Sequence, residues 1–407
     1  MVRSERLAEH PHLAQIRLLL LSALLIFVFT VVIGILNGTD LVDFSHKTLL
    51  THVHTGTLGW ITTSVFAATL WLFGGSSPTG WRASLPRLLA PATVVAIVAY
   101  NLAFFTTTGS ARPTVGGFVF LVIAGWLTWL VGSLKSVVLS VPRLGILAAL
   151  ATASFGGLLG VLLGIMIATG NDILPGDAYG SHPATMVIGF LIPTGMALAE
   201  WHLRPELVEE GATRAGWAQI GLPFIGGLCV TIGLLAESEP LIIVSLPFEI
   251  VGVGIMVARL WPGVRMVRMS EGSSALLAAP TVFWLIANIF MFIYLIGRYQ
   301  GDFDDVPTHL ILALDHMMFI GVMSNALFAQ VRAATPQVGS QAVRILSLAM
   351  NVGLAGFALG LLGDVTILKR IFTPIMGLGI LYGVAVCVSA LAAGDRGGSE
   401  PAPRVAV

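Results

Sequence analysis

The sequence predicts an all-α, polytopic membrane protein with about twelve transmembrane helices and both termini on the cytoplasmic side. Hydrophobic residues make up 56% of the 407 residues and charged residues only 10%, and the mean hydropathy is +0.91. A soluble domain carries about 25% charged residues, so this composition belongs to the membrane class. The apolar residues are grouped in long segments, and each is close to the ~20 residues that cross a bilayer.

Turn residues separate these apolar segments, as in GGSSPTG and NDILPGD. We interpret residues 1–15 as a cytoplasmic N-terminal tail, 16–393 as a single twelve-helix transmembrane domain, and 394–407 as a disordered cytoplasmic tail. The expected spans are roughly residues 16–36, 48–74, 87–106, 115–138, 144–169, 182–201, 216–235, 240–261, 277–297, 307–331, 341–362 and 371–393.

The basic residues support both the number of spans and their orientation. With the N-terminus inside, 16 of the 21 Lys and Arg residues fall on the cytoplasmic side, and the outer side keeps Lys47, Arg112, Arg298, Lys369 and Arg370. Basic loops stay on the cytoplasmic side of a membrane, and a wrong count of helices would remove this asymmetry. We therefore expect a multi-pass protein of a bacterial or archaeal cytoplasmic (inner) membrane, surrounded by lipid. A net charge of zero gives no reason to expect nucleic acid as a partner.

The histidines are the main functional signal. In the predicted topology the spans near 48–74, 182–201 and 307–331 all enter from the outer side, so six of the nine histidines belong to the outer leaflet or its edge: His46, His52, His54, His182, His309 and His316. Imidazole is a common ligand of metal ions and haem iron, and polar groups inside a membrane are usually functional. The alternative is that they are interfacial histidines bonded to loop carbonyls and water, which suits His46 and His309 at the helix edges.

Helical geometry separates the two neighbouring histidines. At 100° per residue His52 and His54 point about 200° apart, so they are expected to serve different partners on the two sides of one helix. His309 and His316 are seven residues apart and return to nearly the same face. The candidate cofactor- or metal-binding residues are therefore His52, His54, His182, His309 and His316.

Three stretches that contain these histidines resemble known haem proteins. THVHTGTLGWITTSVFAATLWLFG (51–74) resembles the part of cbb-type cytochrome oxidase catalytic subunits in which a His-x-His pair precedes Gly-Trp and a long apolar helix. GSHPATMVIGFLIPTGMALAEW (180–201) is similar to the haem-copper oxidase helix that supplies a copper ligand. LDHMMFIGVMSNALFA (314–329) is similar to NnrS-type haem- and copper-containing membrane proteins.

The resemblance implies an oxidase-like bundle that holds one or two b-type haems, with copper as a further metal. In the cbb-type family the two histidines of the pair bind two different haems. We expect His54 and His316 to ligate a low-spin haem. His52 would bind a second haem or metal on the opposite face, with His182 and His309 as its partners or as copper ligands. Lys47 and Arg298 are candidates for pairing with haem propionates.

The implied function is that of a membrane redox protein near the outer face. It would bind or reduce a small gas, nitric oxide or oxygen, or relay electrons to a small redox protein or another membrane subunit. The sequence has no adjacent His-His pair, the copper-binding pair of that family, so oxidoreductase activity stays open. Two alternatives remain: an NnrS-like protein that holds haem and copper under nitric oxide stress without turnover, and a metal-ion transporter.

Overall fold

The computed structural model describes residues 7–75, 78–107, 109–299 and 305–394, and every regular element in these ranges is a helix. The elements are, in chain order, η2 (Leu7–Glu9), α1 (Leu13–Gly38), α2 (His46–His54), η3 (Thr55–Thr62), α3 (Thr63–Phe73), α4 (Trp81–Thr106), α5 (Ala111–Ser133), η4 (Leu134–Ser136), α6 (Val141–Thr169), α7 (Ala178–Ala184), η5 (Thr185–Leu191), α8 (Ile192–Leu203), η6 (Pro205–Glu209), α9 (Arg214–Leu235), α10 (Glu239–Met266), α11 (Ser274–Tyr299), α12 (Thr308–His316), η7 (Met317–Ser324), α13 (Asn325–Ala334), α14 (Ser340–Leu362) and α15 (Thr366–Gly394).

Within the described residues, twelve helical segments are long and apolar enough to cross a membrane, which confirms the predicted number. Eight of these spans are single α-helices, and span 4 is α5 followed by the short 3-10 helix η4. Span 2 (α2, η3, α3), span 6 (α7, η5, α8) and span 10 (α12, η7, α13) are composite. The first helix begins at Leu13, slightly earlier than expected, and residues 1–6 and 395–407 of the two predicted tails lie outside the described residues.

Each composite span contains a π-helix in the same place. The π-helices η3, η5 and η7 begin directly after the α-helical segments that carry the histidines. Hydroxyl side chains at their far ends stabilise the wide turns: Thr62 Oγ1 donates to the carbonyl of Thr57, and Ser324 Oγ donates to that of Phe319, both at 2.9 Å. Because π-helical turns are frequent at functional sites, their recurrence beside the histidines makes this region a candidate site.

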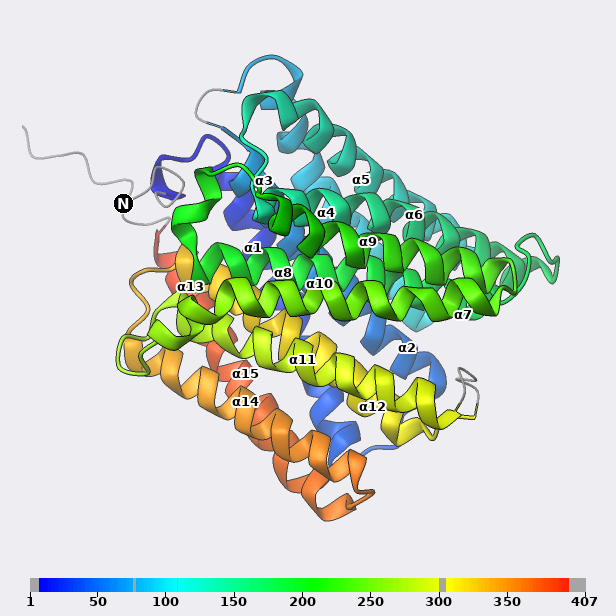
Figure 1. Cartoon of the computed structure of the whole chain (residues 1–407). Helices are drawn as coiled ribbons and strands as arrows, with labels where there is room; N and C mark the ends of the chain where they lie inside the picture. The colour runs from blue at the N-terminus through cyan, green and yellow to red at the C-terminus, as the bar shows by residue number, and fades with distance from the viewer. Residues whose placement is uncertain (1–6, 76–77, 108, 300–304, 395–407) are drawn as a thin grey trace, which may run out of the picture.

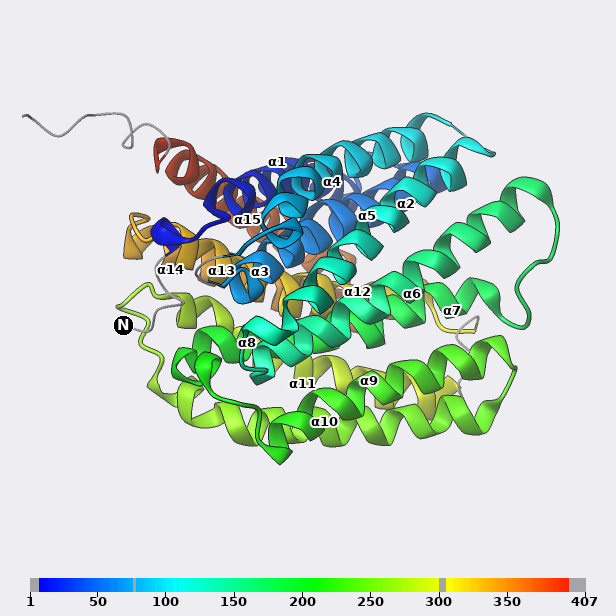
Figure 2. The ribbon, with the colours of Figure 1, turned by 90° about the horizontal axis from the view of Figure 1, so that it is seen from above.

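The composite spans form the centre of the bundle. In spans 2, 6 and 10, 89%, 83% and 67% of the residues in the most apolar windows are buried, more than in any other described span. Figures 1 and 2 show α2, α7 and α12 toward one end of the bundle and α3, α8 and α13 toward the other. The histidines on these three segments therefore lie at a common level.

The twelve spans enclose three equivalent compartments between the central spans. Compartment A is bounded by the packed series α12, α14, α15, α1 and α2; compartment B by α2, α4, α5, α6 and α7; and compartment C by α7, α9, α10, α11 and α12. The three series begin at spans 10, 2 and 6, so each central span ends one series and begins the next. The bundle is thus a threefold repeat of a four-helix unit, and each central span borders two compartments.

Candidate functional site

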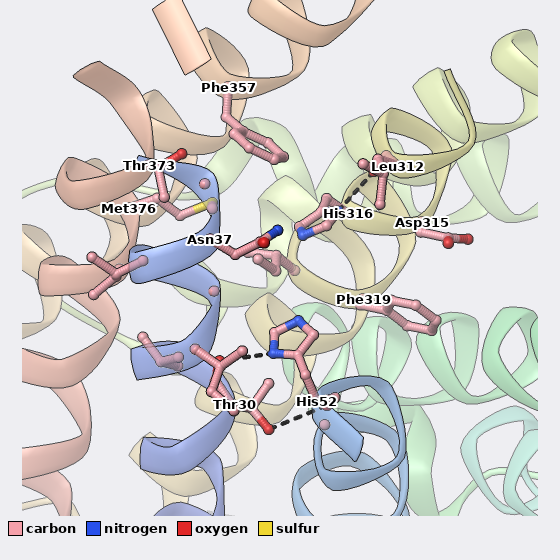
Figure 3. A pocket seen from close by; sticks show the side chains of 18 of the residues that line it. Thr30, Asn37, His52, Leu312, Asp315, His316, Phe319, Phe357, Thr373 and Met376 are labelled. Carbon is pink, nitrogen blue, oxygen red and sulfur yellow. Dashed lines mark hydrogen bonds between the residues drawn. The ribbon is translucent and has the colours of Figure 1, made fainter. Parts of the chain in front are cut away.

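Compartment A contains a cavity of about 460 Å³. His52 of α2 and His316 of α12 both line it. Figure 3 shows the two imidazole rings directed into the same space from different sides, with Asn37 of α1 beside His316. Cavities that bind small molecules and cofactors are usually about 300–1,000 Å³, so this one has the size of a ligand site.

Backbone carbonyls fix the orientation of both rings. His52 Nδ1 lies 3.0 Å from the carbonyl oxygen of Thr30 on α1, and His316 Nδ1 lies 2.7 Å from that of Leu312, one turn back in α12. A carbonyl oxygen only accepts hydrogen bonds, so each Nδ1 carries the proton. In the neutral ring Nε2 then keeps its lone pair, which is the tautomer that ligates metals.

Aromatic residues and glycines form part of the cavity wall. Trp60 and Phe27 stack at 4.8 Å between ring centroids, and Trp60 Nε1 donates to Ser324 Oγ at 3.1 Å, which ties span 2 to span 10 below the histidines. Phe357 packs against His316 with ring centroids 4.8 Å apart. Glycines from four helices expose backbone to the cavity: Gly34, Gly38, Gly56, Gly360 and Gly377.

A cationic group lies at the edge of the cavity. Lys369 of α15 lines it, and its Nζ donates to Oδ1 of Asp40 at 2.6 Å. Arg370 Nε donates to the other oxygen of Asp40 at 2.8 Å. Hydrogen bonds from these two cations hold the pKa of Asp40 below its usual range. Asp364 lines the cavity as well, so this edge carries cations and carboxylates together.

His54 lies outside the cavity and faces compartment B. Its Nδ1 donates to the carbonyl of Leu50 at 2.8 Å, and its ring stacks on Phe104 of α4 with centroids 4.5 Å apart. His182 of α7 donates from Nδ1 to the carbonyl of Gly156 on α6 at 2.9 Å. These two histidines thus share the Nδ1–carbonyl bonds of the pair in compartment A.

The structure pairs the histidines differently from the sequence prediction. The expected divergence of His52 and His54 is confirmed, because they bond to different helices and only His52 lines the cavity. The expected pairing of His54 with His316 is wrong, since His316 shares the cavity with His52. His309 also lines this cavity, about 10 Å along α12 from His316 at 1.5 Å per residue, and so is placed apart from the facing pair.

Sequence reasoning also missed the cation. Among the described residues that line the cavity, Lys369 is present, and Lys47 and Arg298 are not. The signal was available: Lys369 and Arg370 form the only adjacent basic pair in the sequence, on the side predicted to be outer.

The donor set has two histidines per site. The described residues contain no group of three or more His, Cys, Asp or Glu side chains arranged to hold a metal ion. No protein-family model and no curated protein sequence matches this chain. The resemblance to haem-copper oxidases therefore depends on the sequence motifs alone.

Proposed function

We propose that compartment A binds b-type haem, that His52 and His316 would hold its iron, and that the protein transfers electrons in the membrane. The observation that carries this proposal is the pair of facing imidazoles, each with Nδ1 bonded to a carbonyl and Nε2 left to the cavity. A macrocycle that supplies its own equatorial nitrogens needs only two protein ligands. Two histidines suit that requirement better than they suit a bare metal ion, which usually takes three or four.

The remaining cavity residues fit such a group. Trp60, Phe27 and Phe357 supply apolar and aromatic contact for a planar macrocycle. Haem b carries two propionates, and Lys369 at the cavity edge, with Arg370 beside it, offers the opposite charge. The polar and apolar ends of the cavity thus match those of the ligand.

Ligation by two imidazoles favours electron transfer, because it leaves no coordination position for a gas. Haem bound in this way supplies a one-electron couple. The chain's own contribution is to hold both rings in fixed orientations through their carbonyl bonds and to surround the site with buried apolar groups. A rigid, water-poor site needs little reorganisation when its charge changes.

We further propose that the site lies near the outer face of a bacterial or archaeal inner membrane, where a small redox protein or another membrane subunit would exchange electrons with it. The histidine-bearing end of the bundle is the end with few basic residues. Labelling of single cysteines introduced at exposed loop residues such as Asp43 and Glu210 tests this. A membrane-impermeant reagent added to intact cells should label a cysteine at position 43 and spare one at position 210.

The decisive experiment measures haem in the purified full-length protein, by reduced-minus-oxidised absorbance and by haem content per polypeptide. His52→Ala and His316→Ala should each remove the low-spin haem signal of compartment A. The matched control is His46→Ala, which changes the first residue of the same helix, outside the cavity. It should leave the haem content unchanged.

Three results would contradict the proposal: protein without haem after expression with haem supplied, haem content unaffected by His52→Ala and His316→Ala, or stoichiometric metal without haem. The last would favour the metal-ion transporter. Elution volume and melting temperature of each variant show whether a loss of haem comes from unfolding.

A further inference from the structure

The π-helices give a common register for the three repeats. We define the near position as the residue directly before each π-helix and the far position as the third residue before it. The near positions are His54, Ala184 and His316, and the far positions are His52, His182 and Leu314. In compartment A, the near histidine of span 10 faces the far histidine of span 2.

The same rule applied to the next compartment pairs His54 with His182. Compartment B lies between spans 2 and 6, so its near residue is His54 and its far residue is His182. Applied to compartment C, the rule pairs Ala184 with Leu314. The repeat therefore carries two histidine pairs and one apolar pair.

The hydrogen bonds repeat along with the positions. Both near histidines donate from Nδ1 to the carbonyl four residues back in their own helix: His54 to Leu50 and His316 to Leu312. Both far histidines donate to a carbonyl on the preceding span: His52 to Thr30 and His182 to Gly156. The tautomer that leaves Nε2 free for ligation is thus fixed in the same way in both pairs.

The space for the far histidines is made by equivalent glycines. Gly34 lies four residues after Thr30, and a Cβ added there would be 3.4 Å from Cε1 of His52. Gly160 lies four residues after Gly156, and a Cβ added there would be 2.8 Å from Cε1 of His182. Each histidine ring lies directly against the backbone of the preceding span. At Gly160, the closer of the two contacts, a larger residue would collide with the His182 ring.

A cation accompanies each histidine pair. Lys369 stands near the start of α15, which follows the loop between spans 11 and 12. The equivalent loop of the first repeat, between spans 3 and 4, is followed by Arg112 near the start of α5, with its guanidinium carbon 4.3 Å from the centroid of Phe104, the ring that stacks on His54. In the second repeat the corresponding segment holds Glu237 and Glu239. Compartment C thus lacks the histidines and the cation together.

We infer that compartment B is a second site for an iron tetrapyrrole, with His54 and His182 as its axial ligands and Arg112 as the cation for its carboxylates. This inference rests on the proposed function of compartment A, because it extends the same ligand class to an equivalent site. The two sites share α2, which presents His52 to one and His54 to the other. Because the two histidines are only two residues apart on one helix, the two tetrapyrroles would lie at nearly the same depth in the membrane.

Haem and iron per polypeptide in the purified full-length protein test the inference. The wild type should hold two haems. His54→Ala and His182→Ala should each leave one, and that one should disappear on further substitution of His52. His182→Met supplies a different axial ligand, so it should keep both haems and raise the midpoint potential of one, because methionine ligation raises haem potentials. A residue with a structural role alone would not produce that shift.

A glycine pair on α6 provides the matched comparison. Gly160→Ala places a methyl group 2.8 Å from the His182 ring, whereas one at Gly157 meets only Ile123 and Phe120 at ordinary distances of 3.5 and 3.6 Å. Gly160→Ala should change the absorbance or electron paramagnetic resonance signal of one haem and leave the other unaltered. Gly157→Ala should change neither.

The outcomes separate the two proposals. The second site would be overturned, and the first kept, by a single haem that is lost on substitution of His52 or His316. That haem would be unaffected by substitutions of His54, His182 or Gly160. Two haems with one lost in each pair of variants supports both. One haem that depends on His54 and His182 alone overturns the site in compartment A, and absence of haem overturns both.

Discussion

At the scale of single residues, the carbonyl bonds of the histidines decide what the imidazoles can do. A histidine at this depth that used both nitrogens for hydrogen bonds would be a structural residue. His52 and His316 instead each use Nδ1, with one carbonyl apiece, and turn Nε2 to a cavity. None of this was accessible from the sequence, because the acceptor of His52 lies 22 residues away on another helix.

The edge of the cavity gives the first residue-scale prediction. Lys369→Met removes the cation that we assign to a propionate, so haem should transfer to an excess of apomyoglobin severalfold faster than from wild type. Asp40→Asn is the matched control: it removes the carboxylate that holds Lys369 and Arg370 but keeps both cations, so haem transfer should be no faster. Equal rates for Lys369→Met and wild type would contradict this role.

A buried ion pair gives a prediction on stability. Glu200 is fully buried, and Arg259 donates to both of its carboxylate oxygens at 2.6 and 2.8 Å, with Gln219 Nε2 as a further donor at 3.1 Å. Arg259→Leu leaves the carboxylate without its main partner, which typically costs about 3–5 kcal/mol. Thermal melts in detergent should show the loss, and Glu200→Gln combined with Arg259→Leu should lose clearly less. Similar melting temperatures for the single and double variants would show that the pair carries no such penalty.

At the scale of elements, the sequence predicts the spans well and their contacts poorly. All twelve spans were expected, because about 20 apolar residues and the basic loops constrain them strongly. The divergence of His52 and His54 also followed from helical geometry. The partner of His54 did not, since the rotation of each helix relative to its neighbours depends on packing. The π-helices were not expected either, although they set the register of all three central spans.

The docking of the N-terminal segment onto the bundle leads to a prediction on pH. His10 packs against Gly74 at the end of α3, and burial, together with the neighbouring His12, lowers the pKa of His10 to about 4. An unfolded histidine has a pKa near 6.5, so the folded state holds the neutral ring and its stabilisation is complete above that pH. The stabilisation should fall as the pH drops from about 6.5 toward 4.

Limited proteolysis between pH 7.5 and 4.5, with a protease active over that range, measures this release. In wild type, cleavage between η2 and the start of α1 should accelerate as the pH falls. In His10→Gln the rate of this cleavage should depend much less on pH. His46→Gln, at the start of α2, serves as the control and should behave like wild type. A His10→Gln protein with the same pH profile as wild type would assign the effect to other groups.

At the scale of the whole molecule, the threefold repeat explains why the functional groups come in pairs. The repeat was not visible in the sequence, because few positions are fixed by it: the near and far positions, the π-helix, and a glycine within it. Gly59, Gly189 and Gly321 occupy the same place in the three π-helices. The other positions need only be apolar. The three repeats therefore share their helix packing without sharing the same residues.

The arrangement of the two sites around α2 gives a prediction on membrane potential. His52 and His54 differ by about 3 Å along the helix axis, so two haems held there would lie at nearly equal depth. A charge that crosses the whole membrane gains about 2.3 kcal/mol per 100 mV, whereas one that moves parallel to the membrane plane gains almost nothing.

Redox titration in proteoliposomes under an imposed potential of about 100 mV tests this directly. The difference between the midpoint potentials of the two haems should stay constant within a few millivolts when the potential is reversed, although both midpoints shift together relative to the aqueous electrode. A difference that changes by a large part of the imposed potential would place the haems at different depths. That result would contradict the paired sites on α2 and with them the threefold register.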